Sequence, residues 1–376
     1  MQPPSLRIRL VVPGNVRHNS GGNVYNAALA RELTALGAGV ETCPLDGGWP
    51  VGSAEDRRRL GALLRAPAGA EDRIVLVDGL LASGAPEELE SAAAGRPVWI
   101  LLHIPLPDHP ELERRALKAA AGVICTSTSA AAGIRARHGL DGIRVALPGS
   151  DAAALAAGPL AAGSGPAHLI AVAALLPNKD QSLLLAALSR LTELPWTAAL
   201  IGSDSADPAY AARLRDMVKR LGLQGRVDIP GELRGAALEA AWAAADLSLL
   251  ISRAETYGLV VTESLARGIP VVVREGTGAV EALAAGTGPR IAGAEAALPG
   301  AAVALAADPE PLADVLRRWL TEPGLRARWR DAAAAARGRL PGWDATARTV
   351  LGIVAADTLD NRHTRVDSAA GQAVGE

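Results

Sequence analysis

The chain has 376 residues and a formal net charge of −2 at pH 7, a length that allows two domains of about 150–200 residues each. The balanced charge excludes a bulk basic surface of the kind that binds nucleic acid, and no apolar run reaches the roughly 18 residues needed for stable membrane insertion. Two cysteines, Cys43 and Cys125, lie far apart without metal-ligand spacing. We expect them to be buried thiols of a cytoplasmic protein.

Short apolar runs alternate with helical patterns along the first half, which is typical of parallel α/β units. Strands are predicted at 7–12, 74–77, 98–102, 123–126 and 143–146, and helices at 23–36, 56–64, 110–120 and 129–137. The stretch from Asp151 to Pro166 is rich in small residues, Gly and Pro. We therefore predict a first Rossmann-like domain over residues 1–152 and a linker over 153–166.

The alternation restarts at His168 and predicts a second Rossmann-like domain over residues 167–340. Its strands are expected at 168–174, 197–201, 227–229, 247–251 and 271–273, and its helices at 181–191, 208–221, 236–244, 259–267, 309–320 and 325–336. A last helix is predicted within 341–357, and the polar, aperiodic tail 358–376 is predicted to be disordered. Domains of this kind bind ligands at the carboxyl ends of their strands.

Two glutamates, Glu255 and Glu263, bracket seven residues in the most informative segment of the chain. The break at Tyr257-Gly258 and the apolar run from Leu259-Val260 place Glu255 on a strand-to-helix loop and Glu263 one turn into the helix. The N–H groups at a helix start favour an anion, and nearby carboxylates suit the hydroxyls of a sugar or ribose. The segment predicts a nucleotide-sugar site, with an ordinary loop and surface-helix glutamate as the alternative.

The segment from Glu255 to Val272 resembles the family 4 glycosyltransferases of the GT-B type, which carry two glutamates with seven residues between them and then a Gly-x-Pro-Val-Val strand. The resemblance extends from residue 6 to about 355, and Ser20-Gly21-Gly22-Asn23-Val24-Tyr25 is similar to a bacterial subgroup. It implies an α/β fold of two Rossmann-like domains facing a cleft. The implied activity is retaining transfer of a hexose-type sugar from a nucleotide sugar, without a cofactor or metal. No Asp-x-Asp metal motif occurs in the sequence.

The resemblance also implies roles for individual residues. His103, at the end of a strand, would position the sugar beside the reacting carbon, and Glu255 and Lys179 complete the expected catalytic set. The expected donor-binding residues are Gly21, Gly22, Lys179, Leu233, Glu255, Tyr257, Gly258, Leu259, Val260 and Glu263. The expected acceptor-binding residues are Asn23, Thr126 and Ser127, which lie in the first domain.

Some of these assignments have a second interpretation. Lys179 lies at a helix start, where the helix dipole disfavours a cation, so that it needs a neighbouring anion. A pyrophosphate would supply this anion. The alternative is a solvated surface lysine. Thr126-Ser127 equally suits a helix N-cap. The family's usual arginine before the lysine is replaced by Ala174, for which Arg253 or Arg17 are the candidate substitutes.

The acceptor is expected to be a small soluble molecule, because the candidate membrane-facing helix 55–65 mixes arginines with acids and a glycine. The rival functions are a GT-B sugar-nucleotide epimerase and a non-catalytic nucleotide-binding protein of the same fold. The sequence does not specify the donor base, the sugar, the acceptor or the oligomeric state.

Overall fold

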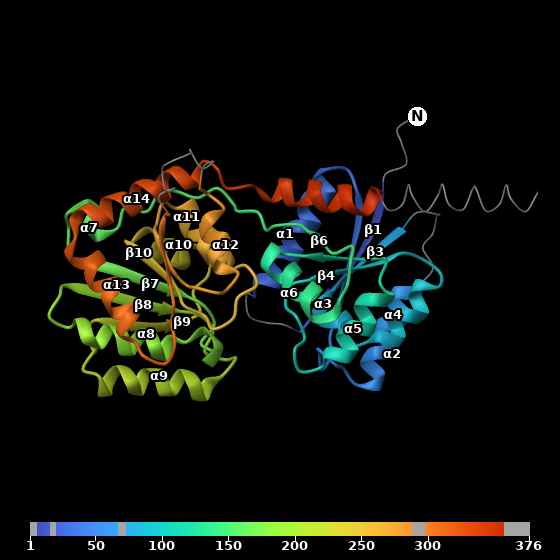
Figure 1. Ribbon diagram of the computed structural model, residues 1–376, viewed down its shortest axis with the longest axis horizontal. Coiled ribbons are helices and arrows are strands. Elements are labelled where there is room, and N and C mark those ends of the chain that lie inside the picture. Colours follow the sequence, from blue (N-terminus) through green and yellow to red (C-terminus); the bar gives the residue numbers. More distant parts are fainter. Residues whose placement is uncertain (1–5, 16–19, 67–72, 288–297, 357–376) are drawn as a thin grey trace, which may run out of the picture. The chain divides into compact units, whose positions relative to one another are not determined.

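The computed structural model describes residues 6–15, 20–66, 73–287 and 298–356. These residues form two compact units, each built on one parallel sheet (Figure 1). Unit 1 runs to Gly149 and resumes at Pro341, and unit 2 comprises Ser150–Leu340. The predicted fold class, two Rossmann-like α/β domains, is confirmed. Arg17 and the tail 358–376 lie outside the described residues.

Unit 1 contains a six-stranded parallel sheet in the order β2-β1-β3-β4-β5-β6. The order reverses between β1 and β3, so that the loops after these strands diverge at a topological switch point, where ligands bind in open α/β sheets. The strands are β1 (Arg7–Pro13), β2 (Gly39–Leu45), β3 (Arg73–Asp78), β4 (Val98–Leu102), β5 (Gly122–Cys125) and β6 (Arg144–Val145).

Helices connect these strands and cover the sheet. They are α1 (Gly21–Ala35), α2 (Ala54–Arg65), α3 (Gly79–Ala82), α4 (Pro86–Ala93), α5 (Pro110–Ala119) and α6 (Thr128–His138). All five residues of β4 are buried, as expected for a central parallel strand covered on both faces.

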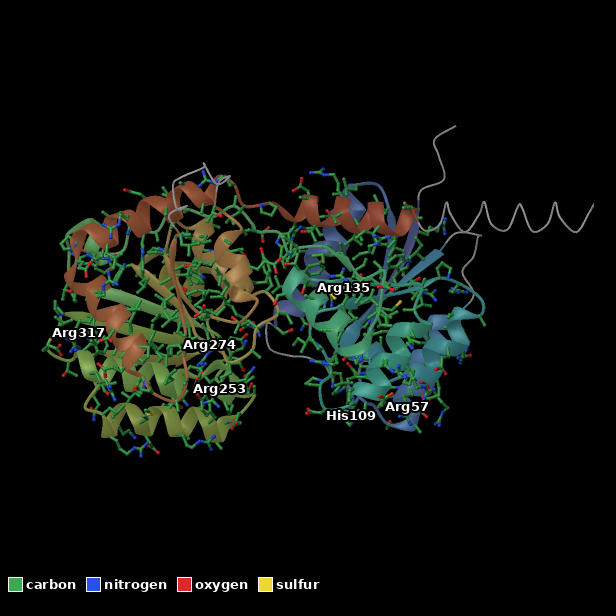
Figure 2. The ribbon with its side chains drawn as sticks, in the orientation of Figure 1. Arg57, His109, Arg135, Arg253, Arg274 and Arg317 are labelled. Carbon is green, nitrogen blue, oxygen red and sulfur yellow. The ribbon has the colours of Figure 1, made fainter. Side chains whose placement is uncertain are left out.

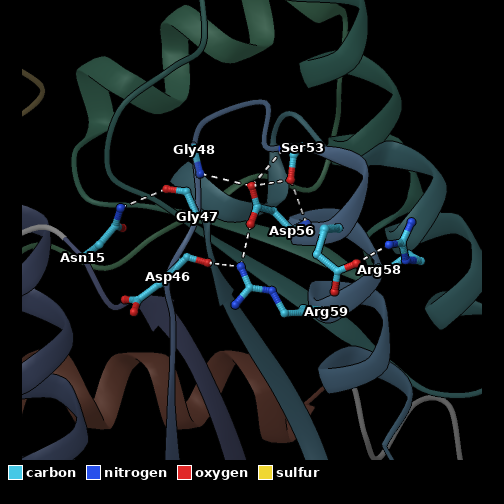
Figure 3. Close-up of polar contacts among 9 residues, drawn as sticks. Asn15, Asp46, Gly47, Gly48, Ser53, Asp56, Arg58 and Arg59 are labelled. Carbon is cyan, nitrogen blue, oxygen red and sulfur yellow. Dashed lines mark hydrogen bonds and ion pairs between the residues drawn. The ribbon is translucent and has the colours of Figure 1, made fainter.

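A polar network closes the loop between β2 and α2 (Figure 3). The carboxylate of Asp56 accepts the Ser53 N–H at 2.9 Å and the Gly48 N–H at 3.2 Å, and the Ser53 hydroxyl in turn accepts the Asp56 N–H at 3.1 Å. Arg59 binds the same carboxylate at 2.5 Å. These contacts form a capping box that fixes the start of α2.

Unit 2 contains a second six-stranded parallel sheet, in the order β12-β11-β10-β7-β8-β9. The strands are β7 (Ala167–Val172), β8 (Trp196–Ile201), β9 (Val227–Gly231), β10 (Leu247–Leu250), β11 (Val271–Arg274) and β12 (Gly300–Val303). This is the strand order of the dinucleotide-binding Rossmann fold, and its switch point lies between β7 and β10.

The helices of unit 2 pack against this sheet around a core that includes Trp196, Leu249 and Trp319. They are α7 (Pro159–Ala162), α8 (Gln181–Leu188), α9 (Pro208–Arg220), α10 (Gly235–Ala243), α11 (Leu259–Ala266), α12 (Ala279–Ala284), α13 (Glu310–Thr321) and α14 (Pro323–Arg337), with two short 3₁₀ turns, η1 (Pro177–Lys179) and η2 (Ser189–Leu191).

The segment expected to be a linker, 153–166, packs within unit 2. Ala156 N donates to Arg267 O at 2.9 Å, and Arg330 donates to Ala156 O at 2.8 Å. The amide of Leu160 binds the buried carboxylate of Asp246. The small residues that suggest a flexible linker instead allow close backbone contacts with α10, α11 and α14.

After α14 the chain returns to unit 1 as a helix over residues 343–356, which lies beside α1 (Figure 1). The buried ring of Trp343 packs edge-on against Tyr25 of α1, with 5.5 Å between the ring centroids. Thr346 donates to Leu147 O at 2.8 Å. This helix therefore completes the core of the first unit.

Candidate functional site

The switch point of unit 2 brings together two residues that are 76 positions apart in the sequence. Lys179 ends the turn η1 after β7, and Glu255 lies on the loop after β10. The Lys179 Nζ atom donates to Glu255 Oε1 at 2.5 Å, and both side chains are largely buried. The loop of Glu255 is held by its own carbonyl, which accepts the Gly278 N–H at 2.8 Å.

This pair supplies the anion that a lysine at a helix start requires. Lys179 precedes α8, where the dipole disfavours a cation. The carboxylate of Glu255 balances that charge in the ligand-free protein. A bound diphosphate in the same place would compete with Glu255 for the ammonium group.

A second ion-pair network adjoins the first and involves two residues that the sequence does not single out, Asp180 and Arg274. Figure 2 shows Arg253 and Arg274 in the same region of unit 2. One oxygen of Asp180 accepts from Arg274 at 2.5 Å and the other from Arg253 at 3.0 Å. Asp180 and Arg274 are buried, whereas Arg253 is two-thirds exposed, at 66% of its side chain.

Arg274 also anchors the network to the backbone of neighbouring loops. Its guanidinium donates to Ile251 O at 2.9 Å and to Leu305 O at 2.5 Å. Asp180 has a left-handed backbone, with φ of 57°, which is uncommon for a residue with a side chain. Since Arg274 neutralises Asp180 at a buried site, the exposed Arg253 leaves this network with an excess positive charge.

The start of α11 lies directly after Glu255. Gly258 has φ of 89°, and a Cβ atom there would lie 2.8 Å from Leu250 Cδ2, so that only glycine suits this turn. Because Leu259 and Val260 are the first residues of the helix, their N–H groups have no acceptor within it. The N–H groups that are expected to bind an anion therefore lie at the start of the helix that follows β10.

Glu263 lies one turn into α11, as the sequence predicts. Burial raises the pKa of its carboxyl group, and the nearby Arg267 opposes this effect. Arg267 donates to the Glu263 carbonyl at 2.9 Å and to the Glu239 carboxylate at 2.6 Å. Its guanidinium also lies over the ring of Trp242, 5.3 Å from the centroid.

Two other expected donor contacts occupy different surroundings. Tyr257 is buried, and within the described residues its hydroxyl has no hydrogen-bond partner; burial raises the pKa of this phenol. Leu233 follows β9 and packs against the cluster that contains Trp242 and Ile269. The neighbouring Glu232 and Arg234 form an ion pair at 2.9 Å.

In unit 1, the residues predicted from the first loop and from β4 meet at the switch point of that sheet. Ser20 caps α1 by accepting the Asn23 N–H at 3.2 Å, and Gly21 and Gly22 occupy the first turn. A Cβ atom on Gly22 would lie 3.2 Å from His103 Cδ2. A side chain at this position would therefore require the histidine ring to shift by a few tenths of an ångström, which glycine avoids.

His103 is buried and makes polar contacts with α1 and with the end of β3. Its Nε2 atom lies 2.9 Å from Asn26 Oδ1 and 3.5 Å from Asp78 Oδ2. The ring packs against Tyr25 at 5.1 Å between centroids. Burial lowers the pKa of the imidazole, and the charge of Asp78 acts in the opposite direction.

The two expected acceptor residues after β5 are buried. Ser127 is fully enclosed, and its hydroxyl accepts the Ala130 N–H at 2.9 Å, which makes it the N-cap of α6. Thr126 is 4% exposed. The structure thus shows the second interpretation of this dipeptide, a helix cap, for Ser127.

Comparisons with known proteins agree with this architecture. Residues 158–336 match the family model described as "Glycosyl transferases group 1". A stretch of 111 residues is 33% identical to mannosylfructose-phosphate synthase of Agrobacterium fabrum and covers 28% of this chain and 24% of that protein. The chain therefore aligns with about a quarter of the length of this curated relative.

Solved glycosyltransferase structures resemble nearly the whole chain. Sucrose-phosphate synthase from Thermosynechococcus elongatus has a TM-score of 0.73 and 18% identity, covering 97% of this chain and 100% of its own. Anabaena HepE, in complex with UDP and glucose, has a TM-score of 0.70 and 19% identity, covering 93% and 99%. The chain thus has the two-domain GT-B fold, and residues 158–336, nearly all of unit 2, match the model of the glycosyl transferases group 1 family.

Proposed function

We propose that this protein is a retaining glycosyltransferase that moves a hexose-type sugar from a nucleoside diphosphate sugar to a hydroxyl of a small soluble acceptor. The main observation that supports this proposal is that Lys179, Glu255 and the first amides of α11 lie together at the switch point between β7 and β10. A cation, a carboxylate and free N–H groups are the groups that a sugar diphosphate needs. The similarity to HepE, solved with UDP and glucose, supports the same ligand class.

The Lys179–Glu255 pair provides a way to couple donor binding to the arrangement of the sugar site. We infer that the diphosphate replaces Glu255 as the partner of Lys179, with the amides of Leu259 and Val260 binding the remaining oxygens. Glu255 is then free to accept hydrogen bonds from hydroxyls of the sugar. Glu263, in the same helix, accepts hydrogen bonds from the ribose.

The transfer itself requires stabilisation of the departing phosphate and of a positively charged sugar carbon. The bond between the sugar carbon and the phosphate oxygen breaks, the acceptor oxygen bonds to the same face of that carbon, and the acceptor proton passes to the leaving phosphate. Lys179 and the helix amides stabilise the phosphate charge. In unit 1, the amides of Gly21 and Gly22 and the imidazole of His103 contribute to the donor site, and Asn23 and Thr126 to the acceptor site.

We further propose that the reaction needs no metal and takes place in the cytoplasm. Within the described residues, no group of three or more His, Cys, Asp or Glu side chains is placed to hold a metal ion; metal independence itself stays a prediction. Cys43 and Cys125 are both present as thiols, which suits a reducing compartment. No helix within the described ranges is long and apolar enough to cross a membrane.

A thermal-shift panel of UDP, GDP, ADP and dTDP tests the donor site. One nucleotide should stabilise the protein by roughly 2.7 kcal/mol at ~100 times its dissociation constant. Lys179→Ala should abolish most of this shift, whereas Lys219→Ala, at an exposed lysine of α9, should retain it. If no nucleotide stabilises the protein, the proposed donor site is wrong.

Catalysis is tested by incubating the preferred nucleotide sugar with the protein and a panel of soluble sugars and sugar phosphates. Time-dependent release of nucleoside diphosphate together with a glycosylated acceptor supports the transferase. Nucleotide binding without release indicates a non-catalytic nucleotide-binding protein, and a donor sugar of altered configuration indicates an epimerase.

A further inference from the structure

The buried residues Asn26, Asp78 and His103 form a chain of hydrogen bonds. The carboxylate of Asp78, at one end, determines which group donates and which accepts in each bond. Asp78 ends β3 and caps α3, and its Oδ1 atom accepts the Leu80 N–H at 2.8 Å. Its Oδ2 atom lies 2.6 Å from Asn26 Nδ2. A carboxylate only accepts hydrogen bonds, so the Asn26 amide must donate to it.

The orientation of Asn26 then determines the protonation of His103. With its NH₂ group directed to Asp78, Asn26 presents its carbonyl oxygen to His103 Nε2 at 2.9 Å. This oxygen is an acceptor, and Nε2 must therefore carry the proton. Because burial lowers the pKa of the imidazole, the neutral ring keeps its lone pair on Nδ1.

The surroundings of the ring leave this lone pair without a partner among the described residues. The Cδ2 edge packs against Gly22, and Nε2 is bound to Asn26. In the part of the chain that the structure describes, Nδ1 has no hydrogen-bond partner and is not among the polar atoms sealed from solvent. Asp78 ends β3, at the switch point of this sheet. Ligands of open α/β sheets bind at such a point.

We propose that Asn26 and Asp78 are positioning residues that hold His103 as the Nε2–H tautomer, so that its Nδ1 atom accepts a hydrogen bond from a hydroxyl of the sugar substrate. The proposal rests on the proposed function for the identity of the ligand. It assigns the histidine the role of an acceptor, which selects a hydroxyl at this point of the sugar. A carboxylate or phosphate oxygen, which has no proton to donate, is disfavoured there.

Asp78→Asn tests the proposal because it reverses the chain of hydrogen bonds and exchanges only one oxygen for an NH₂ group. The new amide keeps its oxygen on the Leu80 N–H and turns its NH₂ toward Asn26, which must then rotate and present its own NH₂ to His103. Nε2 becomes the acceptor, and the proton moves to Nδ1. The substituted protein should therefore carry the opposite tautomer.

The tautomer is measured on the full chain labelled with ¹⁵N-histidine, with His103 assigned by comparison with His103→Gln. The wild-type protein should show a protonated Nε2 and an unprotonated Nδ1, and Asp78→Asn the reverse. Asp207→Asn, the same change at the helix cap of α9, where the carboxylate has no described contact with a histidine, should leave the His103 signals unchanged. A protonated Nδ1 in the wild type, or an unchanged tautomer in Asp78→Asn, overturns the proposal.

Kinetics separate this positioning role from a purely structural one. Asp78→Asn should lower kcat by roughly 10- to 100-fold, the effect of losing one acceptor at a buried site, with little change in the KM for the donor. Asn26→Leu, which removes the intermediate amide, should show the same kcat-specific loss if Asp78→Asn folds poorly. A loss confined to KM, or none in either variant, contradicts the proposal.

Binding of the saturating nucleotide sugar should shift the Nδ1 resonance of the wild type and leave Nε2 protonated. A donor that binds without moving Nδ1 contradicts the hydrogen bond to the sugar. If no nucleotide sugar binds, the proposed function fails with this step, whereas the tautomer comparison of wild type and Asp78→Asn still decides how His103 is held.

Discussion

At the scale of single residues, Glu255 has two roles. Without a ligand its carboxylate neutralises Lys179, and with the donor bound we propose that it accepts hydrogen bonds from hydroxyls of the sugar. Glu263 lies beside Arg267, which binds its main-chain carbonyl, and the Glu263 side chain is proposed to bind the ribose. The two carboxylates flank the same helix start, but their loss should affect different steps.

Glu255→Gln should therefore mainly lower turnover, and Glu263→Gln should mainly weaken donor binding. Removing one charged hydrogen bond costs about 1.5–3 kcal/mol, or roughly 10- to 150-fold. Glu255→Gln also frees Lys179, so that binding of the nucleoside diphosphate alone should be retained. Steady-state kinetics and calorimetry on both variants check this, and near-wild-type kinetics in both would refute the site assignment.

Ala174→Arg should tighten binding of the nucleoside diphosphate by ~1–3 kcal/mol. Ala174 follows β7 at the carboxyl edge of the sheet, and its carbonyl accepts from Gln181 at 3.0 Å. A guanidinium adds a planar fork suited to phosphate oxygens. The measurement is calorimetric titration of the same diphosphate into both proteins; unchanged or weaker binding would mean that Arg253 already supplies the second cation.

The sequence indicates the individual residues of the candidate site better than it indicates which of them contact each other. Lys179 stands out because a cation at a helix start is unfavourable. Glu255 stands out because a carboxylate on the loop after a strand suits the hydroxyls of a sugar. Their contact depends on the adjacency of β7 and β10, which is a property of strand order. Asp180 and Arg274 do not stand out, because a charged residue beside a strand or helix end usually faces solvent, and their pairing spans 94 positions.

At the scale of elements, the prediction succeeds where an apolar run or helical period is continuous and fails at the periphery. The sequence does not predict β2, because most of its residues are exposed and Pro44 interrupts it. The strand β12 consists of Gly, Ala and Val, and α12 has only six residues. Such elements form because the existing sheet offers them a hydrogen-bonding edge or a surface to pack on, which local sequence does not encode.

The capping box of α2 gives a pH-dependent prediction at the same scale. Hydrogen bonds from Ser53 and from Gly48 and the contact with Arg59 hold the pKa of Asp56 well below its ordinary value. Since the folded pKa is depressed, the stabilisation is present above the unfolded value of ~3.9 and is lost as pH falls below it. Asp56→Asn should be less stable than the wild type at neutral pH.

The difference in unfolding free energy between wild type and Asp56→Asn should shrink as the pH is lowered through the range below ~4. Denaturant unfolding of both proteins at several pH values measures it. Asp331→Asn, at an exposed site within α14, serves as the control for loss of one carboxylate. A difference that stays constant across the acid range contradicts the role of the capping box.

At the scale of the whole molecule, the charges of α2 bear on the nature of the acceptor. Arg58 pairs with Glu55 and Arg59 with Asp56, so that the four arginines of this helix leave a net charge of only +2. Attraction to anionic lipid amounts to ~1 kcal/mol for each cation near the surface. The protein should therefore not co-sediment with anionic liposomes at moderate salt, and strong, salt-sensitive co-sedimentation would indicate a lipid-linked acceptor instead.

The helix over residues 343–356 should be essential to unit 1 although it follows unit 2 in the chain. Trp343 is 4% exposed, and Trp343→Ala should destabilise the protein by ~3–5 kcal/mol, the usual cost of removing a buried tryptophan. The exposed Arg348→Ala, in the same helix, is the matched control. Equal unfolding free energies for the two variants would show that this helix does not contribute to the core.

The return of the chain to unit 1 at Pro341 also fixes an order of events during biosynthesis. A ribosome that has finished residue 149 must add about 190 further residues before the helix that packs on Tyr25 exists. At the usual 5–20 residues per second, this delay is roughly 10–40 s. The nascent first unit waits through that interval with the α1 surface around Tyr25 uncovered, while the later-made unit 2 already contains all of its own strands. We therefore expect unit 2 to reach its native state first, and the first-synthesised part of the polypeptide to mature last.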